Sequence, residues 1–369
     1  LWIREHQPQL YRKADYFLLW ADLVNFLLGA EPVTTNSLAS RTLLFDFSRQ
    51  DWSEPLLSWS GLDREKLARI VPAGKVVGKI APSLTEELNL PGGLLLVSGG
   101  HDQCLNALGC GAIAPGKLVC GLGTYECLAP VYSPLADPLK LLPEKLNMEN
   151  HVVPGLVVSF LYHQAGLLVR WFRDTFASSE SASADIYRRL NQEIPEQPTG
   201  LFVLPHFEPP QWPVYVKETA GVILGLKTTT SRGEILKAIM EGTSFYFLKG
   251  MASLKRLGIP VKECLASGGG ASSDAWLQIH ADIFGFPFTR PRVTEAGLAG
   301  CAMLAGLACG LYGSFSEAAA LFIQEEKTFY PDARRHRIYQ EKYEIFQKIY
   351  SAVKPLLTAM AEPKIRKSQ

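Results

Sequence analysis

The segment 94–103 brings an acid and an amide to the end of a short apolar run. Leu94 to Val97 leads through two glycines to His101, Asp102 and Gln103. A carboxylate at the end of a strand is suited to act as a general base, and an amide beside it can both donate to and accept from hydroxyl groups. An aspartate before a helical pattern is equally typical of a helix N-cap. These residues alone therefore leave catalysis and capping open for Asp102.

Two further segments have the composition of phosphate-binding loops. The triple glycine 268–270 follows an apolar run and precedes a helical pattern, so its backbone can approach a bound anion closely. Gly123 and Thr124 lie between two apolar runs, where a hairpin of glycine and hydroxyl residues can hold phosphate through backbone N–H groups. An ordinary hairpin turn explains Gly123 and Thr124 as well, and a helix N-terminus alone explains the three glycines. Together with Asp102, however, they indicate phosphoryl transfer from a nucleotide to a hydroxyl.

The elements that must position these residues alternate between strands and helices, which predicts an α/β fold. Strands are expected at 76–80, 94–97, 117–120, 128–131 and 201–204. Helices are expected at 1–30, 62–69, 164–176, 231–254, 276–284, 296–311 and 339–361. Ser231 and Glu234 form a capping box at the start of the long helix. The small residues after Asp102 predict a helix packed closely on a neighbour, whereas 177–199 is polar and variable in character, and no element is assigned to it.

Length and charge bound the class of protein. The 369 residues suffice for two domains, and Pro115-Gly116 favours a division into 1–114 and 115–369. The formal net charge of +1 predicts no attraction to nucleic acid or membrane surfaces. The apolar runs fall short of the roughly 20 residues that span a bilayer. The seven cysteines contain no C-x-x-C pair, so we expect reduced, buried thiols in a cytoplasmic protein. The histidines show no ligand spacing, so no structural metal is expected.

Five motifs in order along the chain resemble those of the FGGY carbohydrate kinases, which share the actin-like ATPase (ribonuclease H-like) fold. The similar segments are 34–45, Gly100 to Gln103, Gly123-Thr124, 221–242 and Gly268 to Asp274. The resemblance covers essentially the whole chain. It implies a two-domain enzyme that uses ATP and Mg²⁺ to phosphorylate a sugar or polyol hydroxyl, with the metal arriving on ATP. It is also compatible with a homodimer.

The resemblance implies a role for each candidate residue. Asp102 would be the general base, and Gln103 and His101 would contact the substrate. Three segments would bind the nucleotide, and their residues are Gly123, Thr124, Gly166, Arg170, Gly269, Gly270 and Asp274. For Arg170, a surface salt bridge is an alternative to a phosphate contact.

The chain also departs from the family pattern. Thr35 stands where the family usually has an aspartate, and the segment 207–211 lacks the usual arginine. No first phosphate hairpin precedes Leu1, so we expect a first domain that is incomplete at its N-terminus and a chain that is poorly active alone. A non-catalytic nucleotide-binding module on the same fold is therefore the alternative hypothesis, and the sequence does not select a particular sugar.

Overall fold

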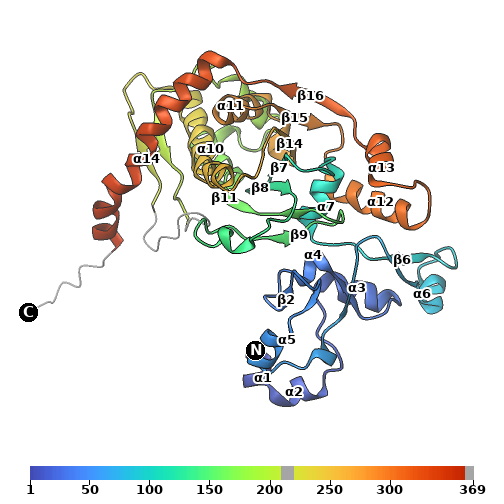
Figure 1. Cartoon of the computed structure of the whole chain (residues 1–369). Helices are drawn as coiled ribbons and strands as arrows, with labels where there is room; N and C mark the ends of the chain where they lie inside the picture. The colour runs from blue at the N-terminus through green and yellow to red at the C-terminus, as the bar shows by residue number, and fades with distance from the viewer. Residues whose placement is uncertain (209–219, 362–369) are drawn as a thin grey trace, which may run out of the picture.

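The computed structural model describes residues 1–208 and 220–361. The departure noted at 209–211 lies outside the described residues. Figure 1 shows the N-terminal elements, in blue, on one side of a larger body that is built around a mixed sheet. The predicted α/β fold is therefore observed, and the strands of the main sheet all lie after residue 116.

An eight-stranded sheet forms the larger body, in the order β16-β15-β14-β7-β8-β10-β9, with β11 also paired to β8. Its strands are β7 (Lys117–Leu122), β8 (Tyr125–Tyr132), β9 (Glu149–Asn150), β10 (Val157–Val158), β11 (Leu161–Gln164), β14 (Glu263–Ser267), β15 (Phe288–Pro291) and β16 (Glu325–Phe329). Strands β7, β14 and β15 run parallel to one another, whereas β8 returns antiparallel to β7. The strands predicted at 117–120 and 128–131 are thus one hairpin.

Helices cover both faces of this sheet, because successive side chains of a strand point to opposite faces. Leu118 and Cys120 of β7 belong to one hydrophobic cluster and Val119 to another. The first cluster includes side chains of α8 (Gly166–Phe176), α9 (Ile186–Gln192), α10 (Arg232–Arg256), α11 (Asp274–Phe284) and α14 (Ala333–Ala361). The second includes side chains of α7 (Asp102–Gly109), α12 (Ala296–Ala308) and α13 (Phe315–Phe322). The capping box of Ser231 and Glu234 is present at the start of α10.

The N-terminal part consists of short elements around small hydrophobic clusters. Its helices are α1 (Trp2–His6), α2 (Pro8–Lys13), α3 (Trp20–Leu28), α4 (Asn36–Ala39), α5 (Glu54–Ser60) and α6 (Pro82–Glu87). Its strands are β1 (Val33–Thr35), β2 (Phe45–Asp46), β3 (Asp51–Trp52), β4 (Arg69–Val71), β5 (Val76–Lys79) and β6 (Leu95–Val97), which pair two by two. The helix expected at 62–69 is only one 3₁₀ turn at Arg64–Lys66. Strands β12 (Phe202–Leu204) and β13 (Val222–Leu224) form a separate pair.

Helices α7 and α12 pack backbone to backbone, as the small residues after Asp102 predicted. A Cβ at Gly109 would lie 1.7 Å from the carbonyl oxygen of Ala296, and one at Gly300 would lie 2.1 Å from that of Leu105. Only glycine fits at either position. This packing anchors the helix that begins at Asp102 to the larger body, although α7 precedes the domain division expected at 114 and 115. That division stays a prediction.

The one helix expected over residues 1–30 is wrong. The segment forms three helices, and α3 exposes apolar side chains, with Trp20 84% and Leu27 65% exposed. The side chain that α3 buries is Asp22, which is 4% exposed. Helical spacing identifies a face of the helix, but it does not determine whether that face contacts the protein or solvent. The buried carboxyl is costly, because burial raises the pKa of Asp22 to about 6.

This burial predicts how Asp22→Asn changes stability. Between the ordinary pKa of 3.8 and the folded value of about 6, the native state holds a proton that the unfolded state has lost. Stability therefore falls as the pH rises through this window, and the penalty is complete above it. We expect the variant to lose this slope and to gain up to about 3 kcal/mol at neutral pH. Denaturant titrations from pH 4 to 7 check this, and a slope equal to that of the wild type would contradict it.

Five of the seven cysteines are buried, and all seven are free thiols, but Cys301 and Cys309 are exposed. The expectation of uniformly buried thiols is wrong for these two, because α12 and its end present one side to solvent. Among the described residues, no helix combines the length and the apolar character needed to cross a bilayer.

Candidate active site

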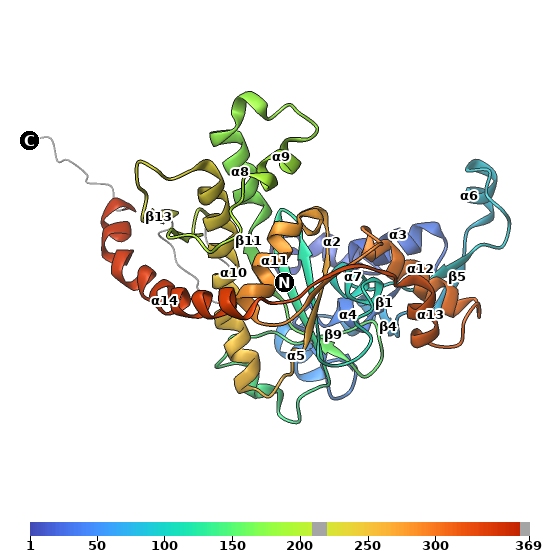
Figure 2. The ribbon, with the colours of Figure 1, turned by 90° about the horizontal axis from the view of Figure 1, so that it is seen from above.

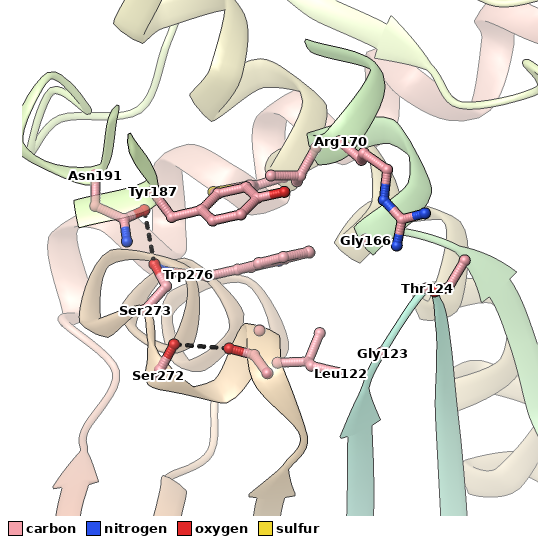
Figure 3. A pocket seen from close by; sticks show the side chains of 14 residues that line it. Leu122, Gly123, Thr124, Gly166, Arg170, Tyr187, Asn191, Ser272, Ser273 and Trp276 are labelled. Carbon is pink, nitrogen blue, oxygen red and sulfur yellow. Dashed lines mark hydrogen bonds between the residues drawn. The ribbon is translucent and has the colours of Figure 1, made fainter. Parts of the chain in front are cut away.

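A pocket of about 350 Å³ lies where the β7–β8 hairpin, the glycine loop after β14 and the helices α8, α9, α10 and α11 meet (Figure 3). Figure 2 shows α8 and α9 standing out together on the side of the body that carries α10 and α11. Six of the predicted nucleotide-binding residues line the pocket together: Gly123, Thr124, Gly166, Arg170, Gly269 and Gly270. The other lining residues are Leu122, Val169, Tyr187, Asn191, Met240, Ser272, Ser273 and Trp276.

Parallel strand pairing brings the two loops together. In β7 and β14, Gly121 lies opposite Ser267, so the hairpin and the glycine loop leave the sheet at the same end. Gly268 has a φ of +84°, which favours glycine, and a Cβ there would lie 2.8 Å from the carbonyl oxygen of Leu122. By contrast, a Cβ at Gly269 would meet no atom within 4 Å. Gly269 therefore borders open space in the pocket.

The N-terminus of α8 sits directly on the hairpin tip. A Cβ at Gly166 would lie 2.1 Å from the carbonyl oxygen of Gly123, and the Leu167 amide donates to the carbonyl of Thr124 at 3.0 Å. The Gly123 amide itself donates to the carbonyl of Tyr125 at 3.0 Å. A phosphate would thus meet the Thr124 end of the hairpin, rather than the Gly123 N–H, together with the positive end of the α8 dipole.

Arg170 supplies a positive charge to this end of the pocket. Its side chain extends from α8, and its guanidinium lies toward Gly166 and Thr124 (Figure 3). Within residues 1–208 and 220–361, Arg170 forms no ion pair. The surface salt bridge considered as an alternative is therefore not formed in this structure. An unpaired guanidinium beside a glycine hairpin is suited to bind a phosphate group.

Two aromatic rings line opposite sides of the pocket, Tyr187 from α9 and Trp276 from α11 (Figure 3). Arg173 of α8 donates to the hydroxyl of Tyr187 at 2.9 Å, and its guanidinium lies over the Tyr187 ring. The hydroxyl of Ser273 donates to Asn191 at 3.0 Å, which joins α11 to α9. Flat apolar walls of this kind suit a planar aromatic ligand.

Sequence reasoning missed the α9 contribution to this site. No element is expected within 177–199, yet α9 lies there and supplies Tyr187 and Asn191. The available signal was weak: Ile186 and Leu190 are spaced by one helical turn and are both buried. Trp276 lines the pocket, whereas Asp274 does not. The Asp274 carboxylate instead accepts from Arg290 at 2.8 Å and Lys327 at 2.6 Å.

Asp102 is the first residue of α7, and its side chain is 82% exposed. The residue at the N-cap position is His101 rather than Asp102. One carboxylate oxygen of Asp102 accepts from the backbone amide of Gln103 at 2.7 Å and lies 3.1 Å from His101 Nε2. Burial and the nearby Arg41 guanidinium lower the pKa of His101 to about 4. A neutral imidazole therefore lies beside an exposed carboxylate that has an open side toward solvent.

The first turns of α7 contact the strand ends that carry the pocket loops. The side-chain oxygen of Gln103 would lie 3.6 Å from a Cβ at Gly121, two residues before Gly123. The hydroxyl of Ser267 donates to Asn106 at 3.0 Å, just before the glycine loop. Asp102 and Gln103 thus lie next to the end of the sheet from which both pocket loops emerge.

No cluster of metal-ligating side chains lines this pocket in the described part of the chain. One such cluster, formed by Cys120, Glu126 and His280, lies fully buried in the protein.

Comparison with known proteins identifies the family. The C-terminal and N-terminal domain models of the FGGY family of carbohydrate kinases match residues 141–309 and 1–109. The chain is 30% identical over 367 residues to xylulose kinase of Bacillus subtilis (strain 168), covering 98% of this chain and 71% of that protein. It is 28% identical over 367 residues to autoinducer-2 kinase of Escherichia coli (strain K12), covering 95% and 68%.

Solved structures agree with this. The crystal structure of xylulose kinase from Rhodospirillum rubrum matches with a TM-score of 0.83 at 23% identity, over 97% of this chain and 72% of that one. That of gluconate kinase from Lactobacillus acidophilus matches with a TM-score of 0.84 at 21% identity, over 95% and 70%. They confirm the two-domain, actin-like α/β fold. The chain therefore belongs to the FGGY family of carbohydrate kinases, enzymes that transfer a phosphoryl group from ATP to a carbohydrate hydroxyl.

Proposed function

We propose that ATP occupies the 350 Å³ pocket with its adenine between Tyr187 and Trp276 and its phosphates at Thr124 and Arg170. The observation that carries this is the unpaired guanidinium of Arg170, which points at a glycine hairpin from inside a pocket with aromatic walls. The phosphates would extend from the pocket toward the sheet end where α7 begins. Asp274 would not contact ATP in this arrangement. Its ion pairs with Arg290 and Lys327 would instead hold the start of α11 and the glycine loop before it.

Asp102 would then accept the proton of the substrate hydroxyl. The hydroxyl oxygen forms a bond to the γ-phosphorus, the bond from that phosphorus to the β–γ bridging oxygen breaks, and ADP leaves. Because the transition state of such transfers is loose, positioning and neutralisation of charge supply most of the rate. Gln103 and neutral His101, on either side of Asp102, would bind further substrate hydroxyls. The exposed carboxylate leaves room for a hydroxylated ligand beside it.

Mg²⁺ fits this site as a companion of ATP rather than as a resident ion. Mg²⁺ usually keeps several waters and binds through substrate phosphates with one or two carboxylates. The pocket lining contains no acidic residue, and the Asp102 carboxylate is exposed. The ion would neutralise charge on the phosphates, while the chain itself orients them.

The substrate would be a sugar or polyol of the kind used by related kinases. A coupled assay of ADP release by the full-length protein, with a panel that includes xylulose, gluconate and glycerol, tests the proposed activity. We expect at least one compound to stimulate ADP release. Nucleotide binding without stimulation by any sugar or polyol would instead favour a non-catalytic nucleotide-binding module.

We also place this protein in the cytoplasm, which supplies ATP and keeps thiols reduced, in keeping with seven free cysteines. A homodimer stays a prediction that light scattering can check. The division into 1–114 and 115–369 can be checked by limited proteolysis.

Gly269→Ala tests the position of the nucleotide. A Cβ at Gly269 meets no protein atom within 4 Å, and the backbone there does not require glycine, so the variant should fold. Its methyl group would project into space that we assign to ATP, and we expect about tenfold weaker ADP binding. Gly297→Ala, in α12, is the matched control because its Cβ also meets nothing within 4 Å. Calorimetry that gives equal ADP affinities for both variants would contradict the assignment.

A further inference from the structure

A buried pair, Glu126 and His280, joins the β7–β8 hairpin to α11, the helix that carries Trp276. Both side chains are fully buried, and Glu126 Oε1 lies 2.7 Å from His280 Nε2. Glu126 lies on β8 opposite Leu122, within two residues of Thr124. His280 lies on α11 one turn after Trp276. The contact therefore bridges the two sides of the proposed nucleotide site.

The hydrogen bonds determine how protons are placed in the pair. His280 Nδ1 lies 2.9 Å from the carbonyl oxygen of Trp276, which can only accept, so Nδ1 carries a proton. The short contact on the other side of the ring then requires a second proton between Nε2 and Glu126 Oε1. The pair is neutral overall in either arrangement of that proton. Such a pair avoids the cost of an isolated buried charge and links the two elements directionally.

The same contacts connect this pair to the pocket wall. His280 binds the backbone of Trp276, whose ring lines the pocket. A Cβ at Gly270 would lie 2.9 Å from Leu122 and 3.2 Å from Trp276, so the hairpin, glycine loop and α11 leave no slack between them. A shift of α11 relative to β8 would therefore change the distance between Thr124 and the Trp276 ring.

We infer that Glu126 and His280 are positioning residues. They set the distance between Thr124 on the β7–β8 hairpin and the Trp276 ring on α11, and thereby the affinity for the nucleotide. This inference rests on the proposed nucleotide site. Neither side chain touches ATP in this account; both act through Thr124 and Trp276. Cys120 Sγ donates to the same oxygen, Glu126 Oε1, at 3.4 Å, whereas the buried Oε2 has no hydrogen-bond partner among the described residues.

Three variants separate positioning from stability. Glu126→Gln can still donate to His280 Nε2, and we expect ADP affinity within about threefold of wild type. Glu126→Leu leaves the imidazole without its partner, so we expect a lower melting temperature and about tenfold weaker ADP binding. The double variant Glu126→Leu/His280→Phe replaces both partners by apolar groups among aromatic neighbours, which include Phe284 and Phe288. It should recover much of the melting temperature but not the ADP affinity.

The readouts are ADP calorimetry, the melting temperature, and KM for ATP against KM for the sugar in the full-length protein. We expect KM for ATP to rise in Glu126→Leu and in the double variant, with KM for the sugar unchanged. Recovery of ADP affinity together with stability in the double variant would overturn the inference. Stoichiometric zinc in the purified protein would overturn it too, since Cys120, Glu126 and His280 would then be ligands. Wild-type protein that binds no ADP would instead refute the proposed nucleotide site itself.

Discussion

Asp102→Asn in the full-length protein is expected to lower kcat for sugar phosphorylation by roughly 10²–10⁴, the usual contribution of a general base. The amide has the size of the carboxylate, and its oxygen can still accept from the Gln103 amide that holds Asp102 at 2.7 Å. It cannot accept the proton of the attacking hydroxyl. Because Asp102 lies outside the pocket lining, we expect ADP affinity to change by less than about threefold.

The control for this variant is Asp185→Asn, which removes an exposed carboxylate that pairs only with Arg188 in the described structure. Steady-state kinetics and ADP calorimetry on both variants separate loss of chemistry from loss of binding. A kcat within about threefold of wild type for Asp102→Asn would contradict the role of this carboxylate. A large loss of ADP affinity would show that Asp102 acts on the nucleotide instead.

Arg170→Ala should have the largest effect on nucleotide binding. A hydrogen bond to a charged group contributes about 1.5–3 kcal/mol, so ADP affinity is expected to fall roughly 10- to 100-fold. Arg170 has no protein partner among the described residues, so its loss leaves no buried carboxylate unpaired and the fold should be unaffected. Arg170→Lys keeps the charge but not the planar fork, and an intermediate affinity is expected.

Arg188→Ala is the matched control for Arg170, because it removes an arginine from the adjacent helix α9 whose side chain is 71% exposed. Calorimetric titration with ADP distinguishes the two sites. If Arg170→Ala binds ADP as tightly as Arg188→Ala, the phosphates lie elsewhere. A lower melting temperature for Arg170→Ala alone would show an unexpected structural role for its side chain.

The sequence predicted those parts of the site that depend on backbone shape. Gly166 and Gly270 stand where two segments approach too closely for a Cβ, so the residue type itself reports the contact. The capping box at Ser231 and the close packing of α7 could be predicted from the sequence for the same reason. In each case a local physical requirement restricts the amino acid.

Features that depend on tertiary partners or on the exact geometry of a turn could not be predicted from the sequence. Asp274 follows the glycine loop in the sequence, yet Arg290 and Lys327, from two other strands, bind its carboxylate. Gly123 donates its amide within its own hairpin, which only the turn geometry reveals. Tyr187 lies in a segment without strong periodicity, and the exposure of the α3 face follows from tertiary packing rather than from spacing.

The most direct test of the central claim is a crystal structure of the full-length protein with a non-hydrolysable ATP analogue and the sugar that stimulates ADP release. We expect adenine between Tyr187 and Trp276, the terminal phosphate at Thr124 and Arg170, and an Asp102 oxygen about 2.6–3.2 Å from a sugar hydroxyl. A nucleotide bound outside this pocket, or an Asp102 carboxylate that contacts no substrate hydroxyl, would contradict it.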